Sequence, residues 1–184
     1  MTPAARLSAA IDLIDAVLAG EPAERALTRW ARASRFAGSK DRAAVRDLVF
    51  DALRRRRSLA WAGGAETGRA ILLAQQAAEG TDLDALCTGE GFDPAPLAPE
   101  ERARLAAPPL PPSDPVRLDY PDFLDAPLRA GLRADFEPVL AAMQARAPVD
   151  LRVNTLKTTP NAATVVLARD GVQVAPQVSI SARR

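Results

Sequence analysis

Cationic side chains dominate the residues of this sequence that could do chemistry. Residues 25–57 contain eleven Lys and Arg against three Asp. A guanidinium can donate two parallel hydrogen bonds to a phosphate, so a cluster of arginines favours a polyanionic ligand. The candidate phosphate-binding residues are Arg35, Lys40, Arg42, Arg46, Arg54, Arg55, Arg56 and Arg57.

The alternative for this segment is a solvated helix face. Arg42 and Arg46 could pair with Asp47 and Asp51 at helical spacing. Most runs of charge only solvate a surface. The four consecutive arginines at 54–57, however, would point around most of a helix and cannot all pair locally.

A second polar group occurs in Asp150–Lys157, where Arg152, Asn154 and Lys157 are predicted to point outward from a strand. They could contact a nucleic-acid backbone or base edge. Equally, they could be an ordinary polar strand face on which Asn154 completes a turn. Of the two tryptophans, Trp30 is predicted to be a core residue, whereas Trp61 could stack on a base.

Other chemistry has few candidates. The sequence has no histidine and a single cysteine, Cys87. This excludes Ser-His and Cys-His pairs, an intrachain disulfide and most zinc sites. Residues 63–70 resemble a phosphate-binding loop in spacing, but Arg69 and Ala70 replace the lysine and the hydroxyl that such a loop needs. We therefore interpret them as a turn between helices.

Composition indicates a globular protein of an intracellular, reducing compartment, which we expect to be the cytoplasm. No signal peptide or membrane span is predicted. The net charge of +1 conceals an asymmetry: residues 1–60 carry +5, residues 61–147 carry −7 and residues 148–184 carry +3. One face is therefore expected to meet a polyanion.

The elements that must position these residues are mainly helical. Apolar residues recur at helical spacing from Leu7 to Leu18, from Ala26 to Trp30 and from Val45 to Leu53, and a shorter helix is predicted over Thr67–Glu79. Residues 94–115 hold eight of the sixteen prolines, which predicts a connector with a brief helix near Glu100–Leu105. The predicted divisions are residues 1–93 (helical), 94–119 (connector) and 120–184.

In residues 120–184 a helix is predicted around Phe136–Met143. After it, the spacing of the apolar residues changes from helical to alternating. Leu151, Val153 and Thr155 alternate with polar residues, as in a half-buried strand. A helix from Pro160 to Leu167 and a second strand around Val172–Pro176 would complete a short β-α-β unit. Two strands alone are marginal, so we expect this sheet to be incomplete.

The motif Pro148-Val-Asp-Leu-Arg-Val-Asn-Thr-Leu-Lys157 resembles the strand that precedes the catalytic domain in RNA (cytosine-5) methyltransferases of the RsmB/Sun/Nop family. The segment Tyr120-Pro-Asp-Phe-Leu124 and Phe136 resemble the linker helices of that family. Residues 35–42 and 47–57 resemble its N-terminal domain, which is similar to the RNA-binding helical protein NusB. The resemblance implies an RNA ligand, ribosomal RNA in particular, contacted by the eight basic residues above and by Arg152, Asn154 and Lys157.

The family's catalytic parts are not expected in this chain. The resemblance implies two cysteines, in Pro-Cys and Thr-Cys contexts, and a glycine-rich turn for S-adenosylmethionine, and the sequence contains neither motif. We therefore expect no cofactor here and a catalytic domain elsewhere in the parent polypeptide. Two alternatives remain open: a separate NusB-like adaptor in transcription antitermination or ribosome assembly, and a protein-interaction module that uses the acidic middle.

Overall fold

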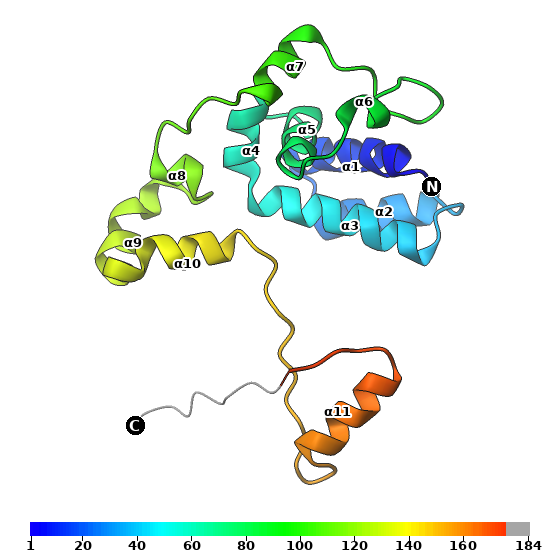
Figure 1. The fold of residues 1–184 in the computed structure, drawn as a ribbon, viewed down its shortest axis with the longest axis vertical. Helices are drawn as coiled ribbons and strands as arrows, with labels where there is room; N and C mark the ends of the chain where they lie inside the picture. The colour runs from blue at the N-terminus through cyan, green and yellow to red at the C-terminus, as the bar shows by residue number, and fades with distance from the viewer. Residues whose placement is uncertain (176–184) are drawn as a thin grey trace. The chain divides into compact units, whose positions relative to one another are not determined.

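The computed structural model describes residues 1–175, which form two compact units, Met1–Arg146 and the segment that begins at Ala147 (Figure 1). Helices account for all the regular secondary structure of the described residues, so the prediction of a mainly α protein is confirmed. No helix among residues 1–175 is long and apolar enough to cross a membrane.

Five helices form the main core of the first unit: α1 (Pro3–Leu18), α2 (Ala23–Ala33), α3 (Ser39–Arg54), α4 (Arg56–Gly63) and α5 (Gly68–Ala78). Helix α1 packs against α2, α3 and α5, and α4 packs along α5 (Figure 1). Residues 71–76 of α5 are all buried, as expected for a helix that its neighbours surround. Each fully buried leucine or isoleucine in this core contributes about 1.5–3 kcal/mol to folding.

Helices α1 and α5 approach closely because Gly68 has no side chain. A Cβ atom at Gly68 would lie 2.2 Å from the carbonyl oxygen of Ile11. The backbone N–H of Gly68 donates to Asp15 Oδ1 at 2.6 Å, so a side chain of α1 satisfies one of the free donors at the start of α5. The proximity of the two helices thus depends on a single missing methyl group.

The proline-rich residues 94–119 pack against this bundle. The predicted brief helix is α7 (Pro99–Ala106), and it begins with a proline, which suits the first position of a helix. Arg69 of α5 holds it through a bidentate pair with Glu101, at 2.7 and 2.9 Å. Short helices α6 (Leu83–Leu86) and α8 (Asp114–Arg117) flank it.

A second, smaller core follows within the same unit. It is built from η1 (Asp122–Leu124), α9 (Asp125–Leu132), η2 (Arg133–Asp135) and α10 (Phe136–Met143). Tyr120 and Phe136 meet edge to face with their ring centroids 5.9 Å apart, and the guanidinium of Arg129 lies 4.3 Å from the centre of the Phe136 ring. Leu118 and Leu140 complete the buried set.

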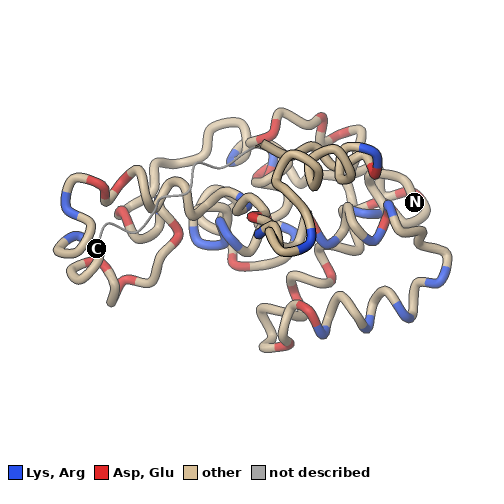
Figure 2. Tube along the Cα trace, turned by 90° about the horizontal axis from the view of Figure 1, so that it is seen from below, with Lys and Arg blue, Asp and Glu red and all other residues tan. Residues whose placement is uncertain are grey.

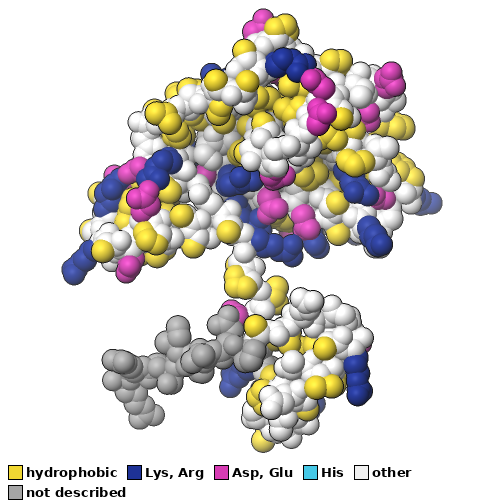
Figure 3. Space-filling view, viewed as in Figure 1, with side chains coloured by type: hydrophobic (Ala, Val, Ile, Leu, Met, Phe, Trp, Pro, Cys, Tyr) yellow, Lys and Arg dark blue, Asp and Glu magenta, His cyan; other side chains and the backbone are white. Residues whose placement is uncertain are grey.

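The second unit contains the predicted helix, α11 (Pro160–Arg169). Thr159 caps it by accepting a hydrogen bond from the N–H of Ala162 at 3.3 Å, and Gly171 follows with a φ of +77°. None of its described residues is buried, and hydrophobic side chains lie on its surface (Figure 3).

The two strands predicted around α11 are absent from the described residues, and that prediction is corrected. Residues 151–154 are irregular and are followed by a turn, and residues 172–175 are irregular. The Asn154 side chain accepts a hydrogen bond from the N–H of Leu156 at 3.1 Å, so the turn that the sequence allowed at Asn154 is formed. A strand needs a partner for its N–H and C=O groups, and residues 147–175 supply none. Pro176, the last residue of the second predicted strand, lies outside the described residues.

Candidate nucleic-acid interface

The four consecutive arginines all pair with carboxylates of the first unit. Arg54 pairs with Asp51, one turn away in α3. The other three reach elsewhere: Arg55 to Glu79 at 3.6 Å, Arg56 to Glu66 at 3.2 Å and Arg57 to Asp122 at 2.8 Å. Only the first of these pairs is local. The run therefore joins the junction of α3 and α4 to three other segments.

Arg57 and Ser58 also connect the two cores. Arg57 donates to the carbonyl oxygen of Tyr120. Asp119 accepts from the Ser58 N–H at 2.8 Å and from the Ser58 hydroxyl at 2.7 Å. Asp119 has a φ of +59°, a left-handed conformation that Asp tolerates better than most residues. These hydrogen bonds hold the first residues of α4 against the second core.

The other predicted basic residues of this unit lie at the surface. Arg46 is 3.3 Å from Asp47, which is also 3.4 Å from Arg146. Arg35, Lys40 and Arg42 are exposed and form no ion pair within residues 1–175. Their charge is therefore available to a ligand.

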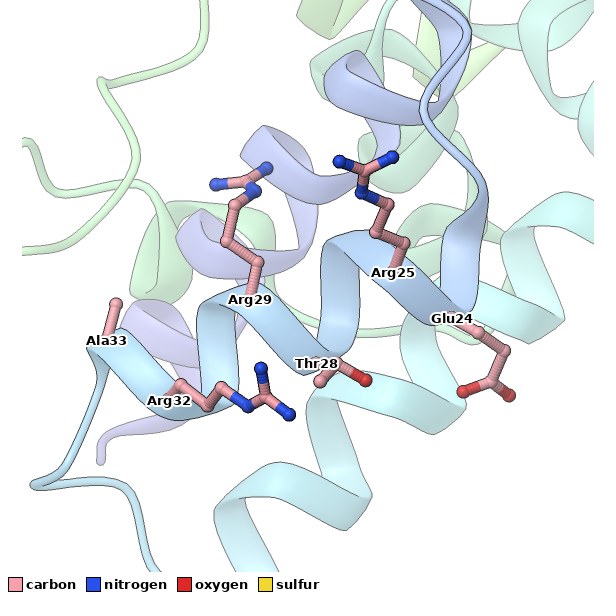
Figure 4. A pocket seen from close by; sticks show the side chains of 6 residues that line it. All are labelled: Glu24, Arg25, Thr28, Arg29, Arg32 and Ala33. Atoms are coloured by element: carbon pink, nitrogen blue, oxygen red, sulfur yellow. The ribbon is translucent and has the colours of Figure 1, made fainter.

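The outer face of α2 carries three arginines that the list of candidates from the sequence omitted. Arg25, Arg29 and Arg32 follow one another at intervals of four and three residues, so they share one face of the helix (Figure 4). Ala26, Leu27 and Trp30 face the core instead, which confirms the core prediction for Trp30. The sequence already contained this signal, because the three arginines occupy helix positions away from the apolar residues.

These arginines line a shallow hollow of about 670 Å³, together with Glu24, Thr28 and Ala33. Arg29 pairs with Glu21 at 2.7 Å, and this hydrogen bond lowers the pKa of Glu21. Arg25 and Arg32 form no ion pair in the described part of the chain. Blue positions recur along this helix at the lower right of Figure 2. We call Arg25, Thr28, Arg29 and Arg32 the α2 face.

The predicted residues of the second unit are exposed. Arg152 lies in the irregular segment before the Asn154 turn, and the N–H of Lys157 donates to the carbonyl oxygen of Asn154 at 3.0 Å. The three side chains therefore do not share the face of a strand. Because a turn rather than a strand presents them, their alternation in the sequence does not fix their direction.

Cys87 is a core residue. Its side chain is 3% exposed, and burial raises the pKa of its thiol above the ordinary value. A nucleophilic cysteine needs the opposite, an accessible thiolate. Within residues 1–175, no three His, Cys, Asp or Glu side chains gather as metal ligands would.

The glycine-rich residues 63–70 form a turn between helices. It joins α4 to α5 and follows a helix, as predicted. A Cβ at Gly63 would lie 2.2 Å from the carbonyl oxygen of Ala70, and one at Gly64 would lie 2.7 Å from Arg104 Cδ. The absence of a side chain at these two glycines therefore lets the turn pack closely against Ala70 and Arg104.

Comparison with known proteins gives one match. The model of the family described as "Methyltr_RsmF/B-like, ferredoxin-like domain" matches residues 120–182, about a third of the chain. No curated protein and no solved structure shows significant similarity to it. The match includes the helices η1 to α10 of the second core, α11, and seven residues outside the described part. It supports the resemblance of this segment to the RsmB/Sun family of methyltransferases.

Proposed function

We propose that this chain is the RNA-binding, substrate-positioning region of an S-adenosylmethionine-dependent rRNA (cytosine-5) methyltransferase. The observation that carries the proposal is the family match over residues 120–182. The match favours a methyltransferase over an unrelated adaptor, since an adaptor gives no reason for this segment. The helices of residues 1–93 would form the NusB-like part.

The α2 face supports the RNA-binding role. It presents three guanidinium groups on one helix face, and only Arg29 forms an ion pair within the described residues. Arg35, Lys40 and Arg42 add exposed charge in the residues that follow. Phosphate contacts of this kind give affinity without sequence preference. The arginines at 54–57 are secondary candidates, because an RNA phosphate would have to displace their carboxylate partners.

The chemistry would come from a catalytic domain outside this chain. The only cysteine is buried, and burial raises the pKa of its thiol. The role of residues 1–184 would therefore be to bind and orient ribosomal RNA. Arg152, Asn154 and Lys157 would contact RNA nearer to the catalytic domain, with which this region would act in one polypeptide.

RNA binding can be tested by neutralising the α2 face. The variant Arg25→Gln/Arg29→Gln/Arg32→Gln should bind single-stranded rRNA fragments more weakly, with a slope of log affinity against log salt shallower by about 2, since each phosphate contact contributes about 0.7. Fluorescence anisotropy over a salt series measures both quantities. Reversing the charges of Arg54–Arg57 should also weaken RNA binding and reduce the salt slope.

The control variant is Arg102→Gln/Arg133→Gln/Arg169→Gln, which removes the same charge from other exposed positions. It should leave the salt slope unchanged. An equal loss in both variants would reduce the effect to net charge, and undetectable RNA binding by the unmodified protein would refute the proposed function.

A further inference from the structure

A second hollow lies in the first unit, against α4, the α4–α5 turn, α7 and α8. Its volume is about 390 Å³, and its lining includes Arg56, Trp61, Glu66, Arg104 and Val116. Pockets for small ligands occupy about 300–1,000 Å³, so this hollow could hold a single small group. The α2 face is a separate surface and shares no lining residue with it.

Trp61 gives this hollow an aromatic wall. Its side chain is 37% exposed, unlike the other aromatic residues that line the two cores. The indole Nε1–H donates to the carbonyl oxygen of Leu110 at 3.0 Å, so the polar edge of the ring is satisfied and its orientation is fixed. A held and accessible indole can stack on any base, because every base has a flat face.

Arg104 places a positive charge beside Trp61. Its Nε donates to the carbonyl oxygen of Ala62 at 3.1 Å, and its Nη2 donates to that of Trp61. It forms no ion pair with a carboxylate in residues 1–175, and its remaining N–H groups can serve a ligand. Gly64 makes this position possible: it has a φ of +88°, and its Cβ would overlap Arg104.

Arg56 supplies a second guanidinium. Its partner Glu66, at 3.2 Å, is exposed, and both side chains are about half accessible to solvent. Exposed ion pairs contribute little stability, so an incoming phosphate can replace Glu66 at small cost. Arg57 also lines the hollow, but Asp122 and the Tyr120 carbonyl already occupy it.

We propose that this hollow binds one unpaired nucleotide of an RNA chain, with the base stacked on Trp61 and a phosphate held by Arg56 and Arg104. The inference rests on the proposed RNA-binding function and assigns it a second contact, specific for single strands. Double-stranded RNA keeps its bases stacked and cannot insert one.

Tryptophan fluorescence tests this site in the full chain. The ligands are a single-stranded RNA oligonucleotide, a duplex of the same sequence, and adenosine monophosphate at equal nucleotide concentration. The single strand should quench the fluorescence of Trp61 at a lower nucleotide concentration than the mononucleotide, which lacks the contacts at the α2 face, and the duplex should not quench it. Trp30, the only other tryptophan, is partly buried on α2, so the quenching assigned to Trp61 is the difference between the unmodified protein and the Trp61→Phe variant.

Affinity measurements separate this site from the α2 face. Trp61→Ala and Arg104→Gln should each weaken single-strand binding about tenfold or more and leave duplex binding unchanged, whereas Trp61→Phe should keep most of the affinity. Wild-type affinity in Trp61→Ala, alongside a loss in the α2 variant, would overturn the nucleotide site and leave the proposed function intact. Equal quenching by adenosine monophosphate would also overturn it, in favour of a free nucleotide.

Discussion

The surroundings of Tyr120 determine the pKa of its hydroxyl. It is the only tyrosine, it is buried in the second core, and its hydroxyl donates to Asp125. Burial, and then the hydrogen bond to Asp125, raise the pKa of Tyr120 to about 12. Both effects favour the neutral phenol.

We expect an ultraviolet absorbance titration to find a single phenolate transition near pH 12. Since the folded pKa lies above the unfolded value of about 10, the stabilisation is complete below pH 10 and is lost as the pH rises through 12. Asp125→Asn should lower the transition. Circular dichroism at each pH establishes that the protein is folded; a transition near pH 10 in folded protein would contradict the structure.

The sequence could not predict which carboxylate each arginine would pair with. The basic cluster was evident, but Arg57 pairs with Asp122, 65 residues further along the chain. Only the packing of the second core against α4 brings them together. The α2 face, by contrast, could have been found from sequence, because Arg25, Arg29 and Arg32 lie opposite Ala26 and Trp30.

At the scale of elements, the contact between α1 and α5 is the most sensitive to substitution. Gly68→Ala places a methyl group 2.2 Å from the carbonyl oxygen of Ile11, so the helices must separate. We expect a loss of about 1–3 kcal/mol in the free energy of unfolding, measured by urea denaturation.

The matched control is Gly131→Ala in α9, where a Cβ meets no atom within 4 Å. Alanine has the higher helix propensity, so this change should stabilise the protein by up to about 1 kcal/mol. If the two variants had the same stability, the close approach of α1 and α5 would not be a determinant of the fold.

Helices were predictable because their signal is local. The apolar repeats of α1 and α3, and the Thr159 cap and Gly171 stop of α11, lie within each element's own sequence. The prediction of strands around α11 was wrong because strand formation depends on residues outside the segment itself. Alternation in Leu151–Thr155 describes a side-chain pattern, but pairing depends on other chain segments, and residues 147–175 contain no partner strand.

At the scale of the molecule, the charge asymmetry has a structural explanation. Acidic residues of the middle segment, among them Glu66, Glu79 and Asp122, pair with arginines of the basic first segment. Much of the opposite charge is therefore used within the first unit. The cations of the α2 face lie outside this network, because the one ion pair among them within residues 1–175 joins Arg29 to Glu21 of the same first segment.

The two units should differ in their ability to fold alone. Both hydrophobic cores lie within residues 7–140, and no described residue beyond Arg146 is buried. A chain of residues 1–146 should therefore unfold at the same temperature and with the same cooperativity as the whole chain, as followed by circular dichroism. The peptide 147–184 should show no cooperative transition, because a ten-residue helix such as α11 is marginal in water without packing.

A lower midpoint for residues 1–146 would mean that the second unit stabilises the first. A cooperative transition in the peptide would mean that it forms its own core, and would contradict the absence of strands from residues 147–175.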